Sequence, residues 1–174
     1  MLPGCTETVA PAIAAWGARL ARSLDESYQF QNTRVFLFDA GVDALRVVGQ
    51  CRLGEEGGDL GDRVQPLDDS ICGRVYRTGQ PALVVDLTLD PDYRQCSAER
   101  MRSVIAVPIV VRDRTVGVLN IESPRPAGLG ITDLECVTLR AAEAATELDR
   151  LRDTAGSLVV APDHEAGPLA VPSR

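Results

Sequence analysis

Residues 70–123 read SICGRVYRTGQPALVVDLTLDPDYRQCSAERMRSVIAVPIVVRDRTVGVLNIES, and this stretch decides the fold. It opens with a short helix, because Asp69 or Ser70 can cap the N-terminus and Gly79 can supply a left-handed C-terminal residue. Pro81 prevents the helix from continuing, so a strand is expected at 82–85. The stretch therefore begins with a helix that leads directly into a strand.

Two apolar runs in the same stretch predict the centre of a sheet. Residues 104–111 are apolar at nearly every position, which is typical of a strand covered on both faces. Residues 115–121 are again β-branched and apolar, and the polar segment 112–114 between the runs predicts an antiparallel hairpin. Before the hairpin, Asp90 can cap another short helix that is expected to run to about Met101.

The residues before this stretch predict a helix and a further hairpin. Apolar side chains recur at helical spacing in residues 11–27, which predicts an amphipathic first helix. The β-rich runs 35–39 and 45–51 are separated by a turn-like segment and predict two more antiparallel strands. The glycine- and acid-rich segment 54–62 is expected to be a mobile connection that can act as a lid.

The residues after the stretch predict a long final helix. Thr132 can cap it, with Glu135 three residues on, which is the spacing of a capping box. The apolar positions of this helix follow a heptad pattern, which favours packing against a partner helix. They are Leu134, Val137, Ala141, Ala144, Leu148 and Leu151.

The chain of 174 residues is expected to form one domain. Residues 10–153 hold all the periodic segments, and residues 1–9 are expected to be a flexible lead-in. Residues 154–174 contain three prolines and two glycines and show no sustained period, so they are expected to be a disordered tail.

The composition argues against several classes of partner. The net charge of −7 and an aromatic content of 4% argue against nucleic-acid binding, which needs a basic surface and stacking side chains. No apolar run approaches the roughly 18 residues of a membrane span, so we expect a cytoplasmic protein with no membrane partner. All 18 basic residues are arginine, which indicates a G+C-rich, bacterial genome.

Metal and cofactor ligands are scarce. The single histidine, His164, lies in the expected tail, which argues against a histidine-ligated metal or haem in the folded part. The five cysteines are odd in number, widely spaced and without a C-x-x-C pair, so they predict neither a disulfide framework nor a zinc site. We expect no metal and no cofactor.

Three motifs in the deciding stretch resemble the GAF domain, the small-molecule sensor fold of phosphodiesterases, phytochromes and bacterial signalling proteins. They are G-x-V-x-x-T-G-x-P at 73–81, Asp-Pro-Asp-Tyr at 90–93, and the pair Val-Pro-Ile at 107–109 with Gly-Val-Leu at 117–119. The resemblance covers about residues 13–152.

The resemblance implies an α+β fold. Its central antiparallel sheet has five to six strands, with the N- and C-terminal helices on one face and short helices and loops forming a pocket on the other. It also implies a homodimer through the first and last helices, in agreement with the heptad pattern.

The resemblance places the ligand between the sheet and the helix-loop segment on one face. Asn120 is the best candidate on the residues themselves, because it shares the parity of Val116 and Val118 and places a polar group in an apolar row. The alternative to a ligand contact is that the Asn120 side chain has a structural role and pairs with a nearby backbone group. Glu122 is expected to reach solvent. The candidate ligand-binding residues are Ile71, Cys72, Asp86, Tyr93, Cys96, Ser103 and Asn120.

The expected function is a non-catalytic sensory or signalling module that binds a small molecule or a signalling partner protein in trans. An alternative is a thiol-dependent free methionine-R-sulfoxide reductase, because that GAF family has cysteines where Cys72 and Cys96 stand. This chain has Val104 and Asn120 where that family has acidic residues, so the proton source is missing. A third possibility is a degenerate GAF domain whose pocket is filled by its own side chains.

Overall fold

The structure of the chain is a computed structural model that describes residues 9–28, 30, 32–52, 64–93 and 101–155. The described residues form an α+β fold in which six strands make one antiparallel sheet. The elements in chain order are α1 Pro11–Tyr28, β1 Asn32–Asp39, β2 Ala44–Arg52, β3 Val64–Pro66, α2 Ile71–Thr78, β4 Ala82–Val84, the 3-10 helix η1 Leu87–Leu89, β5 Ser103–Val111, β6 Arg114–Ser123 and α3 Ile131–Ala155.

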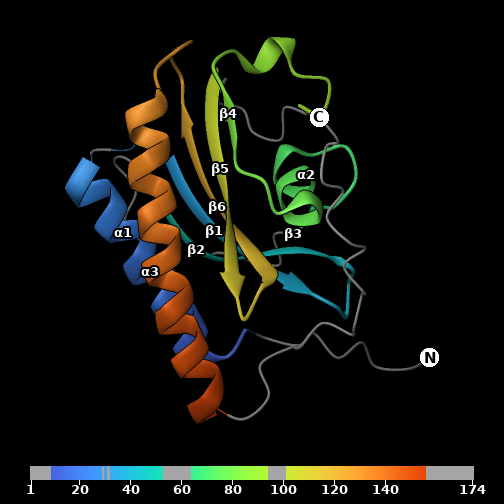
Figure 1. Cartoon of the computed structure of the whole chain (residues 1–174), viewed down its shortest axis with the longest axis vertical. Helices are drawn as coiled ribbons and strands as arrows, with labels where there is room; N and C mark the ends of the chain where they lie inside the picture. Colours follow the sequence, from blue (N-terminus) through green and yellow to red (C-terminus); the bar gives the residue numbers. More distant parts are fainter. Residues whose placement is uncertain (1–8, 29, 31, 53–63, 94–100, 156–174) are drawn as a thin grey trace, which may run out of the picture.

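The sheet has the strand order β3-β2-β1-β6-β5-β4, which places the two halves of the chain side by side. The pairing of β1 with β6 joins residues 80 to 90 positions apart, from Leu37 opposite Gly117 to Asn32 opposite Glu122. Figure 1 shows α1 and α3 together on one face of the sheet and α2 on the other. This arrangement agrees with the layers that the GAF resemblance implies.

The β5–β6 hairpin forms as expected inside the sheet, although the central pair of strands is β1 and β6, and it turns through two residues, Arg112 and Asp113. Both have positive φ, 49° and 62°, which is the geometry of the type I′ turn that fits the twist of paired strands. A bulge between Ile109 and Val110 leaves Val116 as an extra residue on β6. Val116 therefore packs on the α1 and α3 side, and the predicted common parity of Val116 with Asn120 is wrong.

The helix α2 has the predicted caps. The Ser70 hydroxyl accepts a hydrogen bond from the Gly73 backbone N–H at 2.9 Å, and Gly79 ends the helix at φ 64°. The Gly79 N–H donates to the Val75 carbonyl, which satisfies one of the free carbonyls of the last turn. The local sequence alone fixes where this helix begins and ends.

Two apolar clusters cover the two faces of the sheet. The cluster under α1 and α3 contains Trp16, which is buried, and every second residue of β5 and β6. The cluster under α2 is smaller and contains the other residues of these strands, such as Val118. Coverage on the α2 side is incomplete: Val110 is 43% exposed, so the prediction that 104–111 is covered throughout on both faces is wrong at this end.

Two local predictions need correction. Residues 90–93 form a turn and not the start of a helix, because the Asp90 carboxylate accepts the Asp92 N–H and the chain then leaves the turn. The rest of the expected helix falls largely outside the described residues. Thr132 does not cap α3, which already begins at Ile131; the Asp133 carboxylate instead accepts the Gly130 N–H at 2.8 Å.

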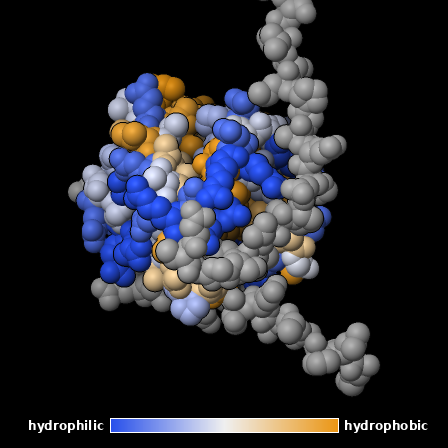
Figure 2. All heavy atoms as spheres, turned by 60° about the horizontal axis from the view of Figure 1, so that its bottom comes forward, coloured by the Kyte–Doolittle hydropathy of each residue, from blue (hydrophilic) through white to orange (hydrophobic). Residues whose placement is uncertain are grey.

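The heptad residues of α3 pack mainly on the chain's own sheet. Val137, Ala141, Ala144 and Leu148 are buried in the cluster under α1 and α3, so this stripe is occupied within one chain. Figure 2 shows hydrophilic residues over much of the described surface on the face it presents, with smaller apolar patches among them. Among the described residues, no helix combines the length and hydropathy needed to cross a membrane.

Candidate functional site

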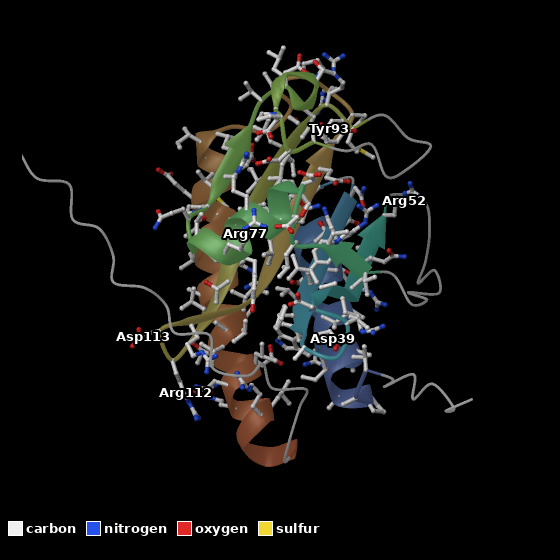
Figure 3. The ribbon with its side chains drawn as sticks, turned by 90° about the vertical axis from the view of Figure 1, so that its right-hand side faces the viewer. Asp39, Arg52, Arg77, Tyr93, Arg112 and Asp113 are labelled. Atoms are coloured by element: carbon white, nitrogen blue, oxygen red, sulfur yellow. The ribbon has the colours of Figure 1, made fainter. Side chains whose placement is uncertain are left out.

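A cavity of about 430 Å³ lies between α2 and the sheet, and we call it the α2 cavity. Figure 3 views the molecule from the side of α2, with Arg77 labelled on this helix and Tyr93 near the upper end of the view. Its walls come from β3 and the turn before α2, the start of α2, the η1 segment with the following turn, the residues just before β5, and strands β1, β5 and β6. The lining residues are Arg34, Gln65, Pro66, Asp68, Asp69, Ser70, Ile71, Cys72, Leu87, Asp92, Tyr93, Met101, Val104, Asn120 and Glu122.

The floor of the α2 cavity is polar at Asn120. This side chain is only 3% exposed, and its Oδ1 accepts a weak hydrogen bond from the Cys72 thiol at 3.5 Å. Its Nδ2 has no hydrogen-bond partner among the described residues. Because Asn120 lines the cavity, this amide donor can bind a group placed there.

Glu122 lies two residues further along β6 and also lines the cavity. Its carboxylate is 17% exposed, and its Oε2 accepts hydrogen bonds from Asn32 at 2.7 Å and Arg34 at 3.3 Å. The prediction that Glu122 reaches solvent is wrong, because β1 lies beside β6 and places Asn32 opposite Glu122 and Arg34 opposite Asn120. All four side chains project from one face of the sheet.

The sequence carries part of a signal for this group. Asn120 and Glu122 alternate with apolar residues on β6, whereas Asn32 and Arg34 flank Thr33 and precede the apolar run of β1. Polar positions of matching parity can come together when two strands pair. The strand was predicted to begin only at Val35, so Asn32 and Arg34 lay outside it, and its pairing with β6 was not predicted.

The turn after η1 is held against α2 by ion pairs. The Arg74 guanidinium contacts Asp90 at 2.9 Å and Asp92 at 2.5 Å, and the hydrogen bond to Asp90 raises the pKa of Arg74. Burial opposes ionisation of Asp90, yet the hydrogen bond from Arg74 still holds its pKa below the ordinary value. These pairs fix Tyr93, the next residue, at the cavity.

Two predicted ligand residues lie outside the cavity lining. Asp86 caps η1 through the Thr88 N–H and pairs with Arg102 at 2.8 Å. The hydrogen bonds from Arg102 and Thr88 lower its pKa to about 2. Ser103 is buried and its hydroxyl donates to the Arg125 carbonyl at 2.9 Å, at the connection to α3.

The other five predicted residues divide into two groups. Ile71, Cys72, Tyr93 and Asn120 line the α2 cavity together, whereas Cys96 lies outside the described residues. A ligand contact by any of them stays a prediction. Within the described part of the chain, no group of three or more His, Cys, Asp or Glu side chains could hold a metal ion.

A second hollow of about 560 Å³ lies between α3 and the end of β5. Its lining is mostly small or apolar, and its Arg112 and Asp149 pair with each other at 3.0 Å. It lacks a buried polar group comparable to Asn120. We therefore take the α2 cavity as the candidate site.

Comparison with known proteins identifies the family. The family model of the GAF domain matches residues 18–148, which is most of the chain. The chain belongs to the GAF family. The comparison with curated protein sequences finds no match to this GAF domain.

Solved structures similar to this GAF domain include both enzymes and signalling domains. Free methionine-R-sulfoxide reductase from Neisseria meningitidis, solved with its substrate, is 26% identical with a TM-score of 0.71 over 81% of this chain and 80% of that one. The GAF domain of a phosphoenolpyruvate-protein phosphotransferase from Coxiella burnetii is 16% identical, with a TM-score of 0.74 over 85% and 89%. The PixJ GAF domain from Thermosynechococcus elongatus is 19% identical, with a TM-score of 0.64 over 83% and 89%. The last two show the fold alone.

Proposed function

We propose that this chain is a cytoplasmic, non-catalytic GAF module of bacterial signalling that binds a small molecule in the α2 cavity and works as a homodimer. The observation that carries the proposal is a cavity of about 430 Å³ above a buried Asn120 amide with an unused donor. Apolar walls with a few placed polar groups are typical of ligand sites. A degenerate domain whose own side chains fill the pocket would not retain this space.

The proposed dimer uses the outward faces of α1 and α3, which lie side by side on one face of the sheet (Figure 1). On α3 the heptad stripe packs inward, so an interface would depend on outward residues such as Leu139, which is 61% exposed. A ligand in the α2 cavity contacts β5 and β6, and α3 packs on the other side of β5. Binding could thus shift α3 and signal to a partner protein in trans.

The direct test is native mass spectrometry of the protein purified from its own host. It reports the number of subunits and the mass of any retained small molecule in one measurement. A dimer that carries a bound molecule supports the proposal. A monomer at micromolar concentration removes the proposed route from the cavity to a partner.

A matched pair of variants locates the bound molecule. Val104→Phe places a ring in the α2 cavity, whereas Val110→Phe lies on the same strand at an exposed position outside that cavity. We expect Val104→Phe to abolish retention of the molecule and Val110→Phe to keep it, with thermal unfolding to check that both fold. Equal retention by both variants would place the ligand elsewhere.

The second candidate function is a thiol-dependent reductase of free methionine-R-sulfoxide. It is favoured by the 26% identity to the Neisseria meningitidis enzyme and by the position of Cys72 on the floor of the α2 cavity. The reaction needs a second cysteine to resolve the oxidised thiol. Cys51 does not fit this role, because it packs on the opposite face of the sheet under α1, where burial raises its pKa with a further contribution from Asp25.

The reductase is tested by turnover of free methionine-R-sulfoxide with a dithiol reductant. An enzyme of this kind loses all activity on Cys72→Ser and on Cys96→Ser, and its two cysteines lie with Cα atoms roughly 4.4–6.8 Å apart. Cys136→Ser on α3 is the matched control. Absence of turnover in the unmodified protein ends this candidate and leaves the sensor.

A further inference from the structure

The two polar residues at the floor of the α2 cavity leave one donor and one acceptor unused. Both hydrogen bonds to the Glu122 carboxylate, from Asn32 and Arg34, go to Oε2, and Oε1 has no hydrogen-bond donor among the described residues. The Asn120 Nδ2 is the unused donor. Because the two residues are i and i+2 on β6, they point the same way, with Cα atoms about 7 Å apart.

The charged lining of the α2 cavity is mainly acidic. Four carboxylates line it, from Asp68, Asp69, Asp92 and Glu122, and three of them are ion-paired: Asp68 with Arg77, Asp92 with Arg74 and Glu122 with Arg34. Arg34 is the one guanidinium in the described lining, and it is already paired with Glu122 at 3.3 Å. A carboxylate or phosphate on a ligand would therefore meet no unpaired cation in this lining, whereas a cation can pair with the second oxygen of Glu122.

The rest of the described lining includes an apolar part that suits a hydrocarbon or aromatic body. It is formed by buried side chains from α2, η1, the residues just before β5 and β5 itself, where Val104 lies opposite Glu122 in the pairing with β6, and Tyr93 lies beside them. The buried members are Ile71, Leu87, Met101 and Val104. A polar ligand without an apolar part would leave these side chains facing water.

We infer that the ligand of the α2 cavity is an amine with an oxygen acceptor and an apolar body. Its protonated nitrogen donates to the free oxygen of Glu122, and its oxygen accepts from the Asn120 N–H. Its apolar body lies against the buried apolar side chains of the lining. This inference rests on the proposed function and adds the chemical class of the ligand. A half-buried carboxylate with one free oxygen favours a charged donor, because a charge-assisted hydrogen bond is roughly twice as strong as a neutral one.

Three probes of one skeleton test the inference on the full chain. Tyramine carries an ammonium group, tyrosol a hydroxyl and 4-hydroxyphenylacetate a carboxylate, and all three share the phenol. Isothermal titration calorimetry of each should show tyramine binding at least about 10-fold more tightly than the other two. In Glu122→Gln this preference should fall to about 3-fold or less, while Glu135→Gln on the exposed face of α3 should keep it.

The outcomes separate the class of ligand from the existence of the site. Tighter binding of tyramine that depends on Glu122 supports the inference. Equal binding of all three probes, or tighter binding of the carboxylate, overturns it and leaves a ligand site of another class. If none of the three binds, the amine class is rejected, and a retained molecule in native mass spectrometry then decides whether the proposed function stands. Thermal unfolding of Glu122→Gln shows whether a loss of binding comes from misfolding.

Discussion

The two faces of the sheet differ in what they bury. The face under α1 and α3 is closed by large apolar side chains except for the hollow between α3 and the end of β5, and Trp16, Ile121 and Leu148 on it are all almost completely buried. The face under α2 keeps a cavity, and at that cavity β6 presents Asn120 and Glu122. Because strand side chains alternate, one strand serves both faces. The comparison indicates that stability comes mainly from the first face and that recognition is confined to the second.

The largest expected effect comes from truncating a residue of β6 that points to the face under α1 and α3. Ile121→Ala removes a fully buried side chain from the closed face, where the surroundings have little room to collapse. We expect the free energy of unfolding to fall by about 2–5 kcal/mol, measured by urea denaturation. A loss below about 1 kcal/mol would mean that the closed face does not hold the fold.

The second prediction concerns the close backbone contact between α1 and the sheet. The helix α1 approaches a bulge in β2, and a Cβ on Gly49 would lie 2.1 Å from the Gly17 carbonyl carbon. Gly49→Ala therefore forces α1 away from the sheet and is expected to cost about 1–3 kcal/mol of unfolding free energy.

The matched control for Gly49 is Gly79 at the end of α2. A Cβ there has ordinary room, with Thr115 Oγ1 at 3.5 Å, although φ is +64°. Gly79→Ala should cost only about 1 kcal/mol, from backbone strain alone. Equal losses for the two variants in urea denaturation would show that α1 packs no more tightly than α2.

Local signals in the sequence predicted much of the fold. The Ser70 and Gly79 caps, the two hairpins and the long last helix each depend on residues close together in the chain, and the structure confirms them. The resemblance to the GAF domain predicted which helices lie on each face of the sheet. The helix expected from Asp90 is wrong in its described part, because the Asp90 side chain accepts the Asp92 N–H and also pairs with Arg74, a contact 16 positions away.

The candidate site was only partly predictable for the same reason. Asn120 and Cys72 were identified from parity and from the family resemblance, and both line the α2 cavity. Glu122 was assigned to solvent, because the strand that covers it, β1, pairs with β6 across 90 residues of sequence. The bulge at Val116 could not be read either, since one extra residue in a ladder leaves no signal in an apolar run.

The third prediction separates ligand binding from stability on the face under α2. Asn120→Ala removes a side chain whose contact within the chain is one weak hydrogen bond from the Cys72 thiol, at 3.5 Å. We expect the unfolding free energy to change by less than about 1 kcal/mol, while retention of the small molecule is lost. A destabilisation as large as that of Ile121→Ala would show that Asn120 is structural and would remove the contrast between the faces.

The smallest expected effect is at the ion pair of Asp86 with Arg102, beside the face under α2. We call this pair the rim. The pKa of Asp86 is lowered to about 2 by its hydrogen bonds from Arg102 and Thr88, against an ordinary value of 3.8. A lowered pKa in the folded state stabilises the fold at pH values above the ordinary pKa, and this contribution is lost as the pH falls from about 4 to about 2.

The Tm of the unmodified protein should therefore exceed that of Asp86→Asn by a small, constant amount between pH 5 and pH 7, and the difference should shrink below pH 4. Differential scanning calorimetry at several pH values measures it, with Asp133→Asn as a control outside this rim. Because Asp86 is partly exposed, the difference at neutral pH should be smaller than any of the losses above. A difference that grows on acidification would mean that the carboxylate of Asp86 opposes folding, and the rim would then be held by the backbone bonds of Arg102 to Leu87 and Ser123 alone.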